Sequence, residues 1–205
     1  MKLGILGGTS LAYTLGKKYL EAGLLVVFGV SNDFDGEAND WKMLNRLYNR
    51  ICPFESALIQ SEIVLICCYN ENFEEVCRAL QNVDLGGKII IDCTNAAYNQ
   101  QLANANTAKI LKIAPNIPVF KAFNNLGVDY PESDLMGIIK ETYYCGDSIP
   151  EKNRVKRLIE LIGYRAVDAG KMHNAQLLEA FYHLSKEICS NKKEQSNYHF
   201  KLITF

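Results

Sequence analysis

Apolar runs alternate along the chain with segments in which apolar residues recur at helical spacing. The first run covers residues 2–6, a helical segment follows and ends at Gly23, and a second run covers residues 24–30. This is the pattern of a strand, a crossing helix and a parallel strand. The first turn of the unit lies at residues 7–12.

The same alternation continues to residue 189 and predicts an α/β fold of the Rossmann type, with a doubly wound, mostly parallel sheet and a small C-terminal α/β extension. We expect residues 1–126 to form a dinucleotide-binding domain and residues 127–205 to pack on it as part of one compact unit. Beyond the first strand, expected strands lie at residues 24–30, 63–67, 88–92, 119–122 and 164–168, and expected helices at residues 10–22, 41–51, 56–60, 73–81, 107–114, 151–162 and 174–189.

The first turn carries a degenerate form of the glycine fingerprint with which dinucleotide-binding folds approach a pyrophosphate. The three glycine positions are occupied by Gly7, Thr9 and Ala12. Ala12 is a mild departure because its position needs only a small residue, whereas Thr9 puts a Cβ where backbone should meet phosphate. The hydroxyls of Thr9 and Ser10 could compensate by binding the phosphate. An ordinary turn is the alternative. The residues expected at the pyrophosphate are Gly7, Gly8, Thr9, Ser10, Leu11 and Ala12.

A polar turn follows the second expected strand, where a dinucleotide-binding fold meets the ribose of adenosine. We expect Ser31 and Asn32 to contact this ribose. Both side chains permit a 2′-phosphate, whereas the carboxylates of Asp33 and Asp35 oppose one. The turn therefore leaves both NADP and NAD open.

Polar side chains follow three successive expected strands. Because ligands of open parallel sheets lie outside the carboxyl ends of the strands, these residues are candidates for the rest of the cofactor. Each one alone is also an ordinary turn or cap residue. We expect Tyr69 and Asn70 at the middle of the cofactor, and Thr94 and Asn124 flanking the nicotinamide. The residues are Tyr69 and Asn70, Thr94 and Asn95, and Asn124 and Asn125.

Charge and cysteine content exclude several classes of protein. The 205 residues include 22 Lys plus Arg and 23 Asp plus Glu, so no basic surplus favours nucleic acid or an anionic membrane. Seven cysteines without a CxxC pair fit small core residues of a reduced compartment. The longest apolar runs are too short to cross a bilayer, and no basic leader precedes the first strand. We expect a cytoplasmic protein.

No arrangement of side chains typical of a metal site or of nucleophilic catalysis is evident. His173 and His183 lie ten positions apart, without carboxylate or cysteine neighbours at ligand spacing. No Ser-His-Asp or Cys-His set is found, so we predict neither a metal nor a catalytic side chain. His173, just before the last expected helix, is the better candidate of the two for a functional role. That helix is apolar on one face, and we expect it to pack on the sheet or in a homodimer.

Several segments resemble the NADP oxidoreductase, coenzyme F420-dependent family, over nearly the whole chain. The resemblance implies an N-terminal Rossmann domain and hydride transfer between NADP and a second redox partner, which is a deazaflavin in the founding members. Related dinucleotide domains serve ferric reductases and imine reductases. The segments that carry the resemblance are residues 92–95 (DCTN), 119–127 (VFKAFNNLG), 143–147 (YYCGD, like a penultimate strand), 167–170 (VDAG), 174–179 (NAQLLE) and 198–202 (YHFKL, like a C-terminal strand).

The predicted function is therefore that of an NAD(P)-dependent oxidoreductase, transferring hydride between NADP(H) and a second redox cofactor or small acceptor similar to a flavin or deazaflavin. Such a transfer needs little from side chains. Family members that prefer NADP carry a Ser-Arg pair after the second strand, where this chain has Ser31 and Asn32, so NAD stays possible. One alternative is a reductase of a small carbonyl or imine, with Tyr69 or His173 as proton donor. Another is a dinucleotide-binding redox sensor without turnover, and in a third Thr9 has abolished binding.

Overall fold

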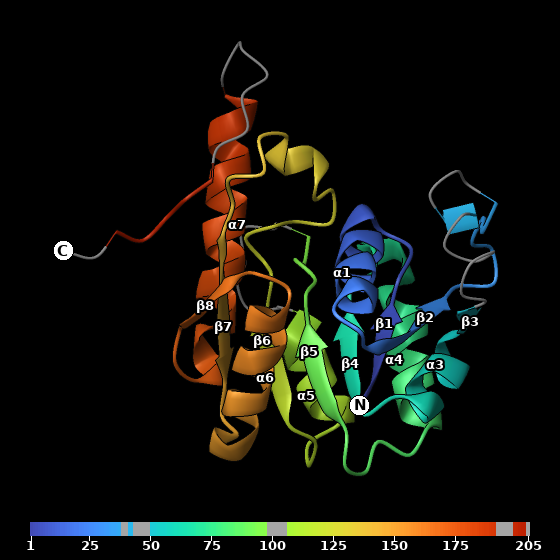
Figure 1. The fold of residues 1–205 in the computed structure, drawn as a ribbon. Helices are drawn as coiled ribbons and strands as arrows, with labels where there is room; N and C mark the ends of the chain where they lie inside the picture. Colours follow the sequence, from blue (N-terminus) through green and yellow to red (C-terminus); the bar gives the residue numbers. More distant parts are fainter. Residues whose placement is uncertain (38–40, 43–49, 98–105, 192–198, 204–205) are drawn as a thin grey trace.

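One sheet of eight strands forms the centre of the protein, in the order β3-β2-β1-β4-β5-β6-β7-β8 (Figure 1). The computed structural model describes residues 1–37, 41–42, 50–97, 106–191 and 199–203. The strands are β1 (Lys2–Leu6), β2 (Leu25–Val30), β3 (Ile51–Pro53), β4 (Ile63–Ile66), β5 (Ile89–Asp92), β6 (Val119–Ala122), β7 (Glu141–Gly146) and β8 (Arg165–Asp168).

Helices cover both faces of the sheet. Apolar side chains of α1 and α6 share one hydrophobic core with one face, and those of α3, α4, α5 and α7 share a second core with the other. Both cores form because the strands are apolar on both sides. The helices are α1 (Ser10–Glu21), α3 (Phe54–Gln60), α4 (Phe73–Asn82), α5 (Asn106–Ile113), α6 (Ile149–Leu161) and α7 (Ala175–Ser190), and three 3₁₀ turns are η1 (Asn70–Asn72), η2 (Glu132–Asp134) and η3 (Met172–Asn174).

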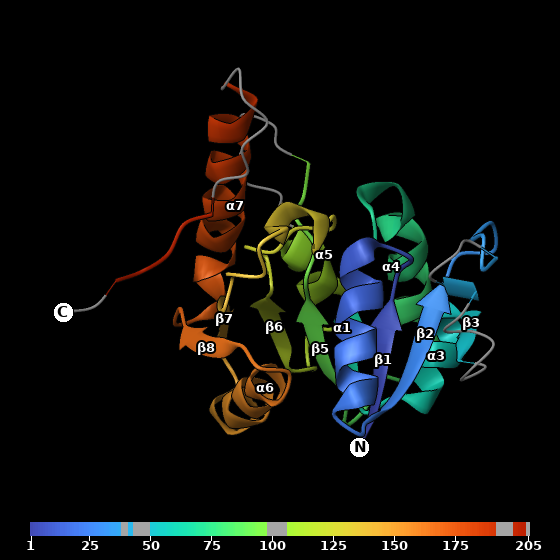
Figure 2. The same ribbon diagram turned by 45° about the horizontal axis from the view of Figure 1, so that its top comes forward.

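The direction of the strands decides which residues meet at each edge of the sheet. Strands β1 to β6 are parallel, and the arrowheads of β1, β2, β5 and β6 point to one edge in Figure 2. Strand β7 is antiparallel to β6, and β8 is parallel to β7. The ends of β1 to β6 therefore share an edge with the starts of β7 and β8. This confirms the predicted doubly wound, mostly parallel fold, with its topological switch point between β1 and β4.

The structure differs from the sequence-based expectations in three places. The three-residue edge strand β3 was not predicted because it is too short to show a period. Of the helix expected at residues 41–51, only Trp41 and Lys42 are described as helical, Ile51 belongs to β3, and residues 43–49 lie outside the described residues. The C-terminal strand expected at residues 198–202 is wrong for the described residues 199–202, which form no strand.

Side-chain contacts hold this C-terminal segment instead. Phe200 stacks on Phe181 of α7, with ring centroids 4.7 Å apart. The Nε2 atom of His199 lies 2.6 Å from the carbonyl oxygen of Ser133. The segment leads away from the body of the protein (Figure 1). The boundary predicted at residue 126 stays a prediction, although β7 and β8 extend the same sheet.

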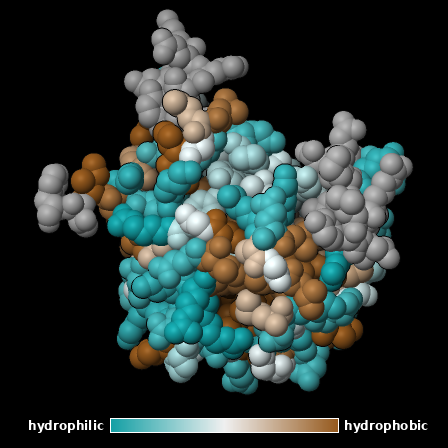
Figure 3. All heavy atoms as spheres, in the orientation of Figure 1, coloured by the Kyte–Doolittle hydropathy of each residue, from teal (hydrophilic) through white to brown (hydrophobic). Residues whose placement is uncertain are grey.

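The surface is mixed in character. Figure 3 shows apolar side chains gathered between α1 and α6, surrounded by hydrophilic ones. All seven cysteines are free thiols. Within the described part of the chain, no helix combines the length and the apolar character needed to span a bilayer.

Candidate functional site

The turn between β1 and α1 has a shape that only glycine permits at its first position. Gly7 has a φ angle of 132°, and a Cβ there would lie 2.4 Å from the carbonyl oxygen of Cys67. Its amide donates to the carbonyl of Gly29, at 2.8 Å. The turn is thereby fixed against the ends of β2 and β4, and the one glycine kept at its expected fingerprint position is required by the backbone.

Thr9 caps α1 and does not present its hydroxyl to a ligand. The side chain is fully buried, and its hydroxyl donates to the carbonyl of Cys67, at 2.7 Å. The same oxygen accepts from the amide of Ala12, at 3.1 Å, as expected of an N-cap residue. The idea that this hydroxyl replaces a glycine at the phosphate is therefore wrong. Ala12 is fully buried, in keeping with a position that needs a small residue.

Three consecutive backbone amides are unpaired at the start of α1, and two of them belong to the partly exposed residues Gly8 and Ser10, whereas Thr9 is fully buried. Among the described residues, the amides of Gly8, Thr9 and Ser10 have no hydrogen-bond acceptor. The amide of Leu11 differs, because it donates to the carbonyl of Val128 at 3.0 Å and is not available to a ligand in this arrangement. Open amides at a helix N-terminus favour an anion. The predicted pyrophosphate site thus reduces to the first residues of the turn.

Replacing Thr9 by alanine is expected to destabilise the protein by about 1 to 2 kcal/mol, because the cap and the buried bond to Cys67 are both lost. Thr9→Ser keeps the hydroxyl and is the matched control, with a smaller loss expected. Urea unfolding followed by circular dichroism measures both. Equal losses in the two variants would contradict a role for the hydroxyl.

A first cavity of about 220 Å³ lies beside this turn. It contains Ser31 but not its neighbour Asn32, which is exposed. The carboxylate residues Asp33 and Asp35 line it, and Lys42 in the following segment is paired with Glu37 at 2.9 Å. The part of the wall where the ribose of the cofactor is expected is therefore acidic. The residues lining it are Gly7, Gly8, Ser31, Asp33, Phe34, Asp35, Phe54, Tyr69 and Asn72.

A second cavity of about 220 Å³ lies between the ends of the central strands and α7. Tyr69 lines both cavities, so they adjoin at this residue. The contribution of α7 has no signal in the sequence, because Tyr182 and His183 look like ordinary helix positions. The lining residues are Cys68, Tyr69, Asn70, Glu71, Asn95, Ala96, Ala97, Val128, Tyr182 and His183.

Four of the six polar residues expected at the strand ends are brought together in one hydrogen-bonded network, whereas Asn125 donates instead to the carbonyl of Glu141 in β7, at 2.9 Å. The Asn70 side chain donates to the carbonyl of Asn95, at 3.0 Å, and the Asn95 side chain donates to the carbonyl of Asn124, at 3.3 Å. Asn124 donates to the carbonyl of Thr94, at 2.8 Å. Only Tyr69, Asn70 and Asn95 reach the cavity, since Thr94 and Asn124 are almost fully buried beneath it.

Asn124 shows two features of a functional position. Its Oδ1 atom is buried and has no hydrogen-bond partner among the described residues. The preceding residue, Phe123, has a φ angle of 63°, which is strained for a residue other than glycine. A buried amide oxygen without a donor costs free energy. Because Asn124 lies beneath the second cavity and does not line it, a donor from the ligand side reaches this acceptor only after the residues above it move.

A fully buried ammonium group lies under the network and was missed in the sequence. Lys121 Nζ contacts Asp92 Oδ2 at 2.7 Å, the Thr94 carbonyl at 2.7 Å, and Glu179 of α7. Burial alone would lower the pKa of Lys121, but the two carboxylates outweigh it and raise this pKa above its ordinary value. The group is therefore charged at neutral pH. Its one sequence signal is a lysine at an otherwise apolar strand position.

The structure overturns the preference for His173. This residue lies in η3, where the amide of Met172 donates to Asp147, the residue directly after β7. The end of β7 lies beside the start of β6, so η3 is at the edge opposite the two cavities. The topology could not be read from the sequence, because the reversal of β7 has no periodic signal. His183 lines the second cavity in its place. Among the described residues, no group of three or more His, Cys, Asp or Glu could hold a metal ion.

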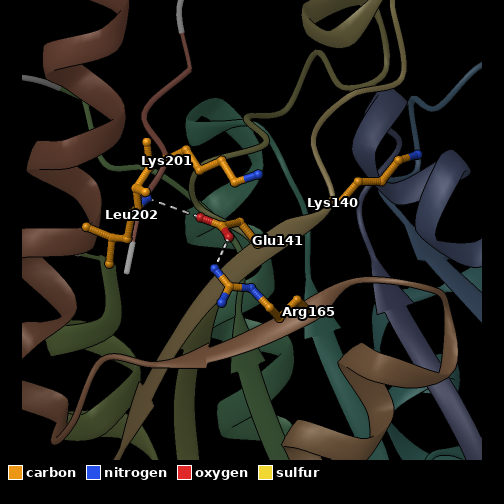
Figure 4. A pocket seen from close by; sticks show the side chains of 6 residues that line it. Lys140, Glu141, Arg165, Lys201 and Leu202 are labelled. Atoms are coloured by element: carbon orange, nitrogen blue, oxygen red, sulfur yellow. Dashed lines mark hydrogen bonds and ion pairs between the residues drawn. The ribbon is translucent and has the colours of Figure 1, made fainter. Parts of the chain in front are cut away.

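A third cavity, of about 570 Å³, lies at the starts of β7 and β8 (Figure 4). Glu141, almost fully buried, accepts from Tyr143 Oη at 2.6 Å, from the Leu202 amide at 3.3 Å, and from Arg165. Burial alone would raise the pKa of Glu141, but these hydrogen bonds and the Arg165 charge lower it below its usual value. The rest of the wall is formed by Lys140, Lys201, Leu202 and Ile203.

Glu141→Gln is expected to lower the free energy of unfolding by about 1 kcal/mol at pH 7, because the exposed side of the Arg165 pair is screened by solvent. A carboxylate with a lowered folded pKa stabilises above its unfolded pKa of about 4.3, and this stabilisation is lost as pH falls through the folded value. The difference between wild type and variant should therefore shrink from pH 7 to pH 3 in urea titrations. Glu160→Gln, in an exposed pair with Lys156, is the control and should show a smaller difference.

The doubly wound sheet defines a Rossmann-type α/β fold, and the glycine turn and the two adjoining cavities at the strand ends form its candidate site. Residues 2–96 match the model of the family described as NADP oxidoreductase, coenzyme F420-dependent. The resemblance seen in the sequence is confirmed there. The match is in keeping with the predicted class, an NADP-dependent oxidoreductase.

Relatives of known name are similar over most of the chain. Metalloreductase STEAP3 of Rattus norvegicus is 24% identical over 184 residues, which are 87% of this chain and 36% of the relative. Metalloreductase STEAP2 of Mus musculus is 22% identical over 180 residues, which are 86% of this chain and 35% of the relative. The chain thus spans about a third of the length of these relatives.

Solved structures support the fold. A crystal structure from Arthrobacter sp. FB24, described as that of a candidate F420-dependent NADP reductase, has a TM-score of 0.80 at 17% identity, with 100% of each chain covered. An imine reductase from Myxococcus stipitatus in complex with NADP+ has a TM-score of 0.65 at 15% identity, covering 93% of this chain and 62% of the other. At these identities the likeness extends to the fold alone.

Proposed function

We propose that the protein binds a nicotinamide dinucleotide across the ends of its central strands and passes hydride between it and a second acceptor. The observation that carries this proposal is the set of unpaired amides at residues 8–10, at the N-terminus of α1 and beside the cavity lined by Gly7 and Gly8, of which those of Gly8 and Ser10 belong to partly exposed residues. Such amides, with the positive end of the helix dipole, bind the pyrophosphate of dinucleotides. The residues present therefore fit the cofactor.

At the adenosine end, Ser31 and the carboxylates of Asp33 and Asp35 are suited to the hydroxyls of a ribose. NADP(H) is the cofactor named by the family. Since a 2′-phosphate would meet two carboxylates, we propose NAD(H) as a second candidate at the same site. Asn32 is exposed and lies outside the lining, so its contribution needs a movement of the turn.

At the nicotinamide end, the unpartnered oxygen of Asn124 is suited to accept from a carboxamide amino group. Tyr69 and Asn70 would lie along the middle of the cofactor, while Thr94 and Asn95 hold Asn124 in place. The bound cofactor supplies the hydride. The chain has to orient it, exclude water and admit the acceptor, which enters the second cavity beside Tyr182 and His183.

A second candidate function is the reduction of a small carbonyl or imine, which needs a proton donor. Tyr69 favours it, because this tyrosine lines both cavities and 46% of its surface is exposed. His183 takes the place of His173 as the other candidate donor. A homodimer through α7, whose Leu177 and Leu184 side chains are exposed, is also proposed.

The test is a fluorescence titration of the protein with NADPH and NADH, followed by turnover with riboflavin, ferric citrate and a cyclic imine. We expect dissociation constants in the micromolar range and turnover with at least one acceptor. Loss of rate with the imine in Tyr69→Phe or His183→Gln, but not with riboflavin, would favour the second candidate. Binding without turnover would indicate a sensor, and no binding of either dinucleotide would refute the proposal.

A further inference from the structure

Helix α7 forms one wall of the second cavity, and Glu179 attaches this helix to the sheet. We propose that Glu179 is a positioning residue, which fixes α7 and the loop at residues 95–97 as the two sides of the nicotinamide pocket. The inference rests on the proposed function, because it concerns the same cavity. It adds a role for a buried charge network that touches neither cavity directly.

The contacts of Glu179 join three separate elements. One carboxylate oxygen contacts Lys121 Nζ of β6, and the other accepts from the amide of Ala96, at 3.2 Å. Lys121 Nζ also donates to the carbonyl of Thr94, at 2.7 Å. A single ammonium and a single carboxylate thus hold both ends of the short segment that leads into the cavity wall.

The position of Glu179 along α7 links it to that wall. Tyr182 and His183 follow it by three and four residues, so all three lie on one face of the helix. Tyr182 packs closely on Gly127, where a Cβ would lie 2.7 Å from the ring. A rotation or shift of α7 would therefore move Tyr182 and His183 relative to Asn95 and Ala96 across the cavity.

Glu179 is not needed to neutralise the charge of Lys121. Asp92 alone balances Lys121, and Asp92 is further bonded to Thr107 at 2.5 Å and to Thr94 at 2.7 Å. A second buried carboxylate brings a desolvation cost without being needed for charge balance. Glu179 instead connects α7 to the loop at residues 95–97. This connection fixes the position of the helix relative to the loop.

Glu179→Gln tests the proposal, because glutamine has the same size but one acceptor oxygen and one amino group. The amino group cannot accept from Lys121 or Ala96, so one of the two bonds is lost while Asp92 still balances the lysine. We expect the Ala96 amide to exchange with deuterium about tenfold faster or more. We also expect the nicotinamide emission of bound NADPH to move toward that of free NADPH, with a dissociation constant changed by less than about threefold. Glu187→Gln, at an exposed position of the same helix, is the matched control.

Unchanged Ala96 exchange and unchanged NADPH emission in Glu179→Gln would overturn the proposal. Loss of affinity together with a general rise in amide exchange would overturn it as well, since that indicates a merely structural residue. Failure of wild-type protein to bind NADPH refutes the proposed function instead. In that case the exchange of the Ala96 amide still decides whether Glu179 orders the loop.

Discussion

Ser10→Glu is expected to weaken dinucleotide binding by about 100-fold or more. Ser10 is the first residue of α1, and its open amide is one of the three proposed to meet the pyrophosphate. A carboxylate there would lie about 5 Å from the phosphate charges, where repulsion at an effective dielectric constant near 20 is about 3 kcal/mol. The variant should stay folded, because an acidic residue in the first turn of a helix interacts favourably with its dipole.

The control for this variant is Ser10→Ala, which removes only a hydroxyl. That hydroxyl donates to Glu132 at 3.2 Å on the exposed surface, so alanine should bind dinucleotide nearly as the wild type does. Fluorescence titration with NADPH and NADH measures both variants, and circular dichroism confirms that they are folded. If Ser10→Glu bound either dinucleotide as tightly as Ser10→Ala, the pyrophosphate would have to lie elsewhere.

The central architecture was predictable because it depends on periodicity. Strands such as β2 and β4 are short and apolar throughout, and the helices between the strands show one apolar face, so the parallel sheet follows from pattern alone. The reversal of β7 and the short β3 carry no such signal. Their placement depends on long-range pairing, with β7 adding to the edge at β6.

The candidate site was predictable as a location more than as chemistry. Ligands of parallel sheets lie at the strand ends, and three residues expected there on this basis, Tyr69, Asn70 and Asn95, line one cavity. It could not show that Thr9 turns its hydroxyl inward, because that depends on the carbonyl of Cys67, 58 positions away. The same rule does not reveal the Lys121 network, because Glu179 of α7 is also 58 positions away from Lys121 in the sequence.

Removing the buried ammonium should have the largest effect on stability. Lys121→Met leaves Asp92 and Glu179 facing each other in the interior without a counter-charge. Breaking a buried ion pair from one side typically costs about 3 to 5 kcal/mol. Because whole domains have only about 5 to 15 kcal/mol of stability, we expect a large fall in the urea midpoint or failure to fold at pH 8.

A further variant separates this electrostatic cause from a loss of packing. The triple variant Lys121→Met, Asp92→Asn, Glu179→Gln has no buried charge and should recover at least about half of the deficit. If the triple variant were no more stable than Lys121→Met, shape rather than charge would determine this part of the core. The triple variant could also recover stability without recovering the emission of bound NADPH. That result would show that the core requires only well-packed side chains, whereas the geometry of the cavity requires the carboxylate of Glu179.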